Sequence, residues 1–61
     1  MKIIKCLSEF IEEEIDAAKH YIEKALKYKD SNPDVAEIFY SLSNEEMRHV
    51  NILHDEVTKV I

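Results

Sequence analysis

Three residues in this chain combine side-chain types and spacing that suit metal binding: Glu14, Glu46 and His49. Glu46 and His49 are three residues apart, so on a helix they would share one face and be separated by one turn. Both interrupt a regular apolar stripe, as Glu14 does in the first half of the chain. A buried carboxylate without a partner is costly, so it normally neutralises or finds a cation. These residues therefore form a candidate metal site, provided that the surrounding elements bring them together.

The second half of the chain is predicted to be one long helix. The chain has no Gly, and its single proline, Pro33, follows directly after Asn32. Pro suits the first position of a helix and Asn suits the N-cap. We therefore expect a turn at 30–32 and a helix over about 33–60.

Apolar residues recur on both sides of the turn with alternating steps of three and four, the period of an amphipathic helix. A second helix is therefore predicted over about 3–29, and the whole chain, 1–61, is predicted to form one all-α domain, an antiparallel helical hairpin. The stripe consists of Leu7, Ile11, Ala18, Tyr21, Ala25, Tyr28, Val35, Phe39, Leu42, Leu53 and Val60, with Glu14, Glu46, His49 and Glu56 in the interrupted slots.

The three candidate ligands are predicted to lie at one height in this hairpin. Heights are counted outward from the turn, starting at Lys29 on the first helix and at Pro33 on the second. Because every residue adds the same axial rise, Glu14 falls farther from the turn than Glu46 and less far than His49. The three side chains can therefore converge at one level.

The chain is predicted to need a second copy. A domain of this size is marginal as an independent folding unit, and a single cysteine excludes an internal disulfide or a Cys-rich zinc site. The wide stripes would leave Phe10, Ile15, Ile22 and Ile52 partly in water in a monomer. Two hairpins packed face to face form a four-helix bundle, so we expect a homodimer. Such a dimer would gather four carboxylates and two imidazoles, a set that suits iron or manganese.

Two segments of the chain resemble the metal-ligand helices of the ferritin-like superfamily, in particular those of rubrerythrins, bacterioferritins and encapsulated ferritins. The segments are EIDAAKHY, residues 14–21, and SNEEMRHV, residues 43–50. In that family a ligand Glu is followed seven residues later by Tyr, as Glu14 is by Tyr21. The next ligand helix carries Glu-Glu-x-x-His, which is matched by the run ending at His49.

The resemblance implies a role for each of these residues. Glu14 would be a terminal ligand, Glu46 a bridging ligand and His49 the nitrogen ligand. The Tyr21 hydroxyl would hydrogen-bond to a ligand carboxylate; the alternative is that Tyr21 lies at the boundary of the core with its hydroxyl in water. The likeness covers one half of the usual four-helix unit, so the second set of ligands must come from another subunit, which implies a ferritin-like four-helix bundle formed by two chains.

The leading function hypothesis is a di-iron carboxylate protein with ferroxidase or peroxide-reducing activity, holding two iron ions per dimer, with manganese as the other metal that the ligands suit. A second hypothesis is a metal-free helical module that dimerises or docks on a partner, with Glu and His as polar specificity elements in its core. A third retains the metal but gives it a structural role without redox chemistry.

Composition excludes some other classes. The net charge of −5 and the lack of a basic stripe argue against a nucleic-acid partner. No apolar run approaches the length needed to span a membrane, and the apolar run at the N-terminus is too short for a signal peptide. The expected partners are therefore metal ions and copies of the same chain, in a soluble cytoplasmic protein with a free thiol.

Both candidate glutamates have acidic neighbours that complicate the choice. Glu14 ends the run 12–14, and Glu46 follows Glu45, so either could belong to a solvated charge run. Only Glu46 of the second pair is in phase with the apolar stripe. The stripe phase therefore favours Glu14 and Glu46.

The remaining groups that could do chemistry are given lesser roles. His20 and His54 lie off the stripe and are predicted to be surface residues. Glu56 is in stripe phase near the open end of the bundle, where it is a candidate for lining an entry route to the metal site or for an accessory metal position. Cys6 stands among apolar residues and is predicted to be a small apolar filler rather than a nucleophile.

Overall fold

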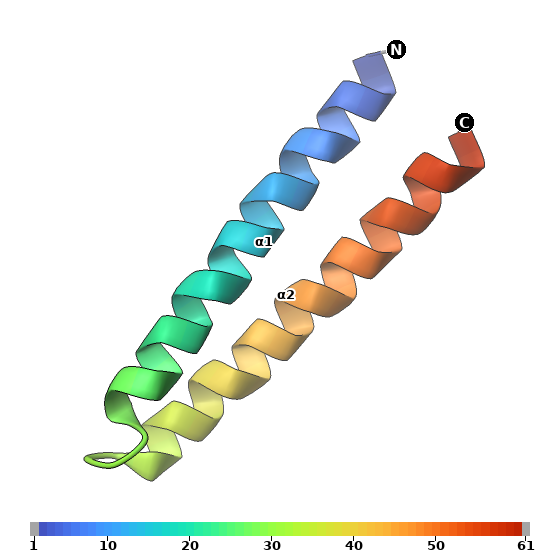
Figure 1. Cartoon of the computed structure of the whole chain (residues 1–61). Coiled ribbons are helices and arrows are strands. Elements are labelled where there is room, and N and C mark those ends of the chain that lie inside the picture. The colour runs from blue at the N-terminus through green and yellow to red at the C-terminus, as the bar shows by residue number, and fades with distance from the viewer. Residues whose placement is uncertain (1, 61) are drawn as a thin grey trace.

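The protein is a rod made of two antiparallel helices (Figure 1). The computed structural model describes residues 2–60, with helix α1 over Lys2–Tyr28 and helix α2 over Pro33–Val60. The Cα atoms extend over 47 × 14 × 9 Å, and the start of α1 and the end of α2 both lie at the end opposite the turn. The all-α hairpin predicted from the sequence is confirmed. Neither helix has a stretch that is long and apolar enough to cross a membrane, a finding that covers the described residues.

The turn is built by Asn32 and Pro33 in the way that their residue types predict. The backbone N–H of Asn32 donates to the Tyr28 carbonyl at 2.8 Å, which closes the end of α1. The Asn32 side-chain oxygen accepts from the backbone N–H of Val35 at 3.4 Å. The backbone carbonyl of Asn32 accepts from the backbone N–H of Ala36 at 3.1 Å. Asn32 is thus the N-cap of α2, and Pro33 occupies the first helical position. The connection consists of residues 29–32, so Lys29 lies in the turn, one residue beyond the end of α1.

The two helices meet along a seam whose residues alternate in steps of three and four. All seam residues are buried or half-buried, as in a coiled coil. On α1 the seam follows the predicted stripe, including Glu14. The seam residues are Ile4, Leu7, Ile11, Glu14, Ala18, Tyr21, Ala25 and Tyr28 on α1, and Ala36, Phe39, Ser43, Glu46, Val50, Leu53, Val57 and Val60 on α2.

On α2 part of the predicted stripe is wrong, because three of the seam positions are each one residue later in the chain than predicted. Leu42, His49 and Glu56 were expected to face α1, but all three are exposed. Ser43 and Val50, with Val57, take their place in the seam. The reason is that the stripe on α2 is wide enough for two phases, and Val50 and Val57 bury more apolar surface than His49 and Glu56 would. Ser43 follows the same phase, and its buried hydroxyl is satisfied by the Ala18 carbonyl.

The most deeply buried seam residues lie mainly toward the turn. There the small residues Ala18, Ala25, Ala36 and Ser43 are each no more than 4% exposed, and they alternate with the half-buried rings of Tyr21, Tyr28 and Phe39. Toward the open end the seam residues, apart from Val50 at 9%, are half-buried.

The isolated hairpin leaves much apolar surface in water. Eight large apolar side chains, Ile3, Phe10, Leu26, Ile38, Tyr40, Leu42, Met47 and Ile52, are 39–58% exposed. Phe10 and Ile52 are exposed, and Ile15 and Ile22 half-buried, in line with prediction. Cys6 is also exposed, so the prediction that it fills the core is wrong. It lies outside the seam, between Ile4 and Leu7.

Candidate metal centre

Glu14, Glu46 and His49 form a cluster halfway along the rod. Glu14 comes from α1 and the other two from α2. Each offers one ligand atom, and these atoms all lie within 4.8 Å of one another. The equal height inferred from helical rise is therefore found in the hairpin.

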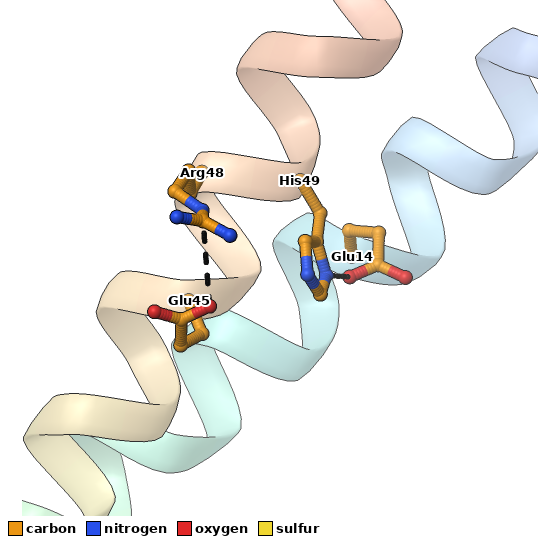
Figure 2. A network of polar contacts seen from close by, with 4 residues as sticks. All are labelled: Glu14, Glu45, Arg48 and His49. Carbon is orange, nitrogen blue, oxygen red and sulfur yellow. Dashed lines mark hydrogen bonds and ion pairs between the residues drawn. The ribbon is translucent and has the colours of Figure 1, made fainter.

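One pair within the cluster is in direct contact. The Nδ1 atom of His49 lies 3.2 Å from a carboxylate oxygen of Glu14, as Figure 2 shows. This is a hydrogen bond across the seam when that nitrogen carries its proton. The His49 side chain is 46% exposed and the Glu14 side chain 26%. The carboxylate thus keeps part of its hydration, and the cluster opens to one side of the hairpin.

The burial pattern separates the candidate glutamates from their neighbours. Glu14 and Glu46 are half-buried seam residues, whereas Glu12, Glu13 and Glu45 are exposed. Glu45 instead faces outward and pairs with Arg48 at 3.8 Å on the surface of α2 (Figure 2). The phase argument thus selected the glutamates that face the other helix.

His49 reaches the cluster from the flank of the seam, and this flank defines an open face of the hairpin. A shallow groove on the other side of the rod is lined by Ile15 and Ile22 of α1 and by Met47 of α2. His49 lies on the flank of α2 opposite to Met47, because positions 47 and 49 fall on either side of the seam. We call the side that carries His49 the ligand face.

Exposed apolar side chains are concentrated on the ligand face. On α2, Leu42 is seven residues from His49, and the neighbouring row holds Ile38 and Ile52. On α1, Phe10 and Ile3 lie on the flank away from the groove. Five of the eight exposed large apolar residues thus lie on the ligand face, and the other three, Leu26, Tyr40 and Met47, lie on the opposite side. Of the five, Phe10, Leu42 and Ile52 are each about one turn from a residue of the cluster.

Tyr21 is half-buried, two turns from Glu14 on the same edge of α1. Its ring stacks on Phe39 with centroids 6.1 Å apart, and Phe39 stacks on Tyr28 at 6.5 Å. Within residues 2–60 the Tyr21 hydroxyl forms no hydrogen bond with a carboxylate of the cluster. The hydrogen bond implied by the family resemblance is thus absent from the single hairpin.

The lesser candidates stay outside the cluster. His20 and His54 are exposed, as predicted for surface residues. Glu56 is exposed and pairs with Lys59 at 3.2 Å. Its predicted place in the stripe is wrong, because Val57 takes the seam position.

One polar residue next to the site was missed by the sequence reading. Ser43 is buried in the seam, and its hydroxyl donates to the Ala18 carbonyl at 3.1 Å. A serine between Leu42 and Asn44 looks like a surface residue when the stripe is traced through Leu42. The seven-residue spacing of Ala36, Ser43 and Val50 is the signal that could have revealed it.

With this geometry in place, the comparison with protein families is decisive. Residues 5–60 match the family model for rubrerythrin. The chain belongs to the rubrerythrin family. This is a family of the ferritin-like superfamily, which the residues around Glu14 and His49 had indicated, and rubrerythrin domains typically bind iron. Searches of the curated proteins and of the solved structures found no match.

Proposed function

We propose that this rubrerythrin-family chain is a di-iron carboxylate protein whose metal site is completed by a second copy. The observation that carries the proposal is the convergence of Glu14, Glu46 and His49 on a face that is open and rimmed by apolar side chains. Family membership supports iron as the metal. The ligand chemistry also suits manganese.

The three residues fit a divalent transition metal. Carboxylate oxygen and imidazole nitrogen bind such ions at about 2.1 Å, so two ligands of one ion lie at most about 4.2 Å apart. The candidate ligand atoms lie within 4.8 Å of one another. Small side-chain rotations that move these atoms by a fraction of an ångström would therefore bring them close enough to bind one ion. Glu14 would be the terminal ligand from α1, while Glu46 would bridge and His49 would supply nitrogen from α2.

Charge balance favours a site shared by two chains. One hairpin brings two carboxylates and one imidazole, so two hairpins bring four carboxylates and two imidazoles. Four carboxylates balance the charge of two divalent ions. The apolar side chains of the ligand face would then be buried around the site, which excludes water and strengthens its electrostatic interactions.

Bound iron would supply electrons to dioxygen or peroxide, which corresponds to ferroxidase or peroxide-reducing activity. The protein side chains would hold the metal and set access to it. Carboxylates hold both iron(II) and the harder iron(III), and Glu46 in the bridging position can change its binding mode between them. Phe10 and Leu42, exposed in the single hairpin, would line the shared interface.

An anaerobic iron(II) titration with mass measurement in solution tests this function. We expect saturation at two iron ions per dimer, followed in air by a near-ultraviolet iron(III) band. Glu46→Ala and His49→Ala should abolish stoichiometric binding while the protein stays dimeric, because each removes a ligand. The matched controls are Glu45→Ala and His54→Ala, which remove exposed groups of the same type from the same helix. Unchanged binding in Glu46→Ala or His49→Ala would refute the site.

The exposed apolar face also supports a metal-free dimerisation or docking module. In that case replacing both Glu46 and His49 by Leu should raise the melting temperature, since polar groups would no longer be buried at the interface. Added iron should then leave the melting of the unsubstituted protein unchanged. Iron that binds but is not oxidised in air would instead indicate a structural metal.

A further inference from the structure

Ser43 holds an unusual position in the seam between α1 and α2. It is the sole buried polar residue of the described part of the chain, at 4% exposure. Its hydroxyl donates to the backbone carbonyl of Ala18 at 3.1 Å. Ala18 is also buried, with 4% of its surface exposed. Across residues 2–60, this bond and the Glu14–His49 contact are the two side-chain hydrogen bonds that join the helices.

The Ser43 bond lies one turn from the candidate ligands on both helices. Ser43 precedes Glu46 by three residues, and Ala18 follows Glu14 by four. On each helix the bonded residue is therefore on the turn side of the ligand, at a distance of roughly 4.5–6 Å along the axis. The bond and the cluster are consecutive layers of the same seam.

Most other contacts in the seam are between apolar side chains, including the stacked rings of Tyr21, Phe39 and Tyr28. Such contacts are largely non-directional, so they oppose small sliding movements of one helix along the other less sharply than a directional bond does. A hydrogen bond depends on both distance and angle and restricts such movement.

We propose that Ser43 is a positioning residue for the metal site. Its hydrogen bond to Ala18 sets the axial register and spacing of α1 and α2, so that the Glu14 carboxylate meets Glu46 and His49 at one level. Ser43 acts through the backbone and touches no ligand atom. This inference rests on the proposed function, because it concerns how the same cluster is held ready for metal.

Removing the hydroxyl should cost the metal-free protein little stability. The Ala18 carbonyl lies inside α1, where it also accepts the N–H of Ile22 in the regular helical pattern, so no buried acceptor is stranded. Alanine also has a higher helix propensity than serine, which offsets the lost bond. Stability and metal binding can therefore be separated by experiment.

The test compares Ser43→Ala with Ser41→Ala, the same substitution at an exposed position of α2. Each variant is titrated with cobalt(II), whose visible absorption bands report coordination geometry, and the metal-free proteins are melted at equal concentration. We expect Ser43→Ala to bind cobalt roughly tenfold more weakly. This is the size of effect typical of residues that orient a metal ligand without binding the metal themselves. Its bands should be altered, while its melting temperature stays close to that of Ser41→Ala.

Two results would overturn the inference while leaving the metal site in place. One is a Ser43→Ala variant with the cobalt affinity and bands of the unsubstituted protein. The other is a loss of melting temperature and helix content that accompanies the loss of affinity, which would make Ser43 a general stability residue. Failure of the unsubstituted protein to bind cobalt or iron would overturn the proposed function itself, and the role of Ser43 with it.

Discussion

At the scale of single residues, the contact that Glu14 makes with His49 and its proposed role as a metal ligand can be separated by a substitution. It pairs with His49 across the seam at 3.2 Å, and it would contribute negative charge to a bound metal. An amide oxygen can accept the same hydrogen bond but carries no charge. We therefore expect Glu14→Gln to weaken cobalt(II) binding by more than about tenfold, since it removes a charged ligand rather than a supporting group.

The same titration provides the control for this prediction. Glu13→Gln makes an identical change at the adjacent, exposed position and should leave the affinity unaltered. Equal affinities for the two variants would mean that Glu14 is not a ligand. The convergence of Glu14, Glu46 and His49 could be foreseen from the place of the turn, the phase of the stripe and the helical rise. The exposure of His49 could not be foreseen, because it depends on which residues of α2 occupy the positions that pack against α1.

At the scale of elements, the start of α2 depends on one side chain. Asn32 accepts the Val35 N–H, so Asn32→Ala leaves that donor without its cap. We expect this change to lower stability by about 1 kcal/mol, which is roughly 4–8 °C in melting temperature for a domain of this size. Thermal melting by circular dichroism at one protein concentration checks it, with Ser31→Ala in the same turn as control. Equal melting of the two variants would show that Asn32 is dispensable.

The two helices differ in how well the sequence predicts their packing. On α1 one phase of the stripe is clearly apolar, so its seam could be traced from Leu7 to Tyr28. On α2 both Leu42 and Val50 are apolar, although only Val50 belongs to the seam, and the buried Ser43 conceals the true line. The choice between the two phases is made by contact with α1. The periodicity of α2 alone therefore does not predict which phase is buried.

At the scale of the whole molecule, the ligand face and the opposite face can be compared directly. Leu42 on the ligand face is 39% exposed, and Met47 on the opposite face is 43% exposed. If the dimer forms across the ligand face, Leu42→Lys would bury a charge at the interface and weaken association by at least about tenfold. Met47→Lys should have a much smaller effect. Sedimentation equilibrium of the metal-free variants measures both, and equal effects would place the interface elsewhere.

The position of the cluster along the rod has a consequence for symmetry. Glu14 lies next to the midpoint of α1, which runs over Lys2–Tyr28, and Glu46 lies at the midpoint of α2, which runs over Pro33–Val60. Two rods related by a twofold axis perpendicular to their length can therefore superpose these levels and still overlap from end to end. A cluster near one end would force such partners into a staggered arrangement with much of their length unpaired. The central placement thus makes full overlap and a shared site compatible in a single symmetric pair.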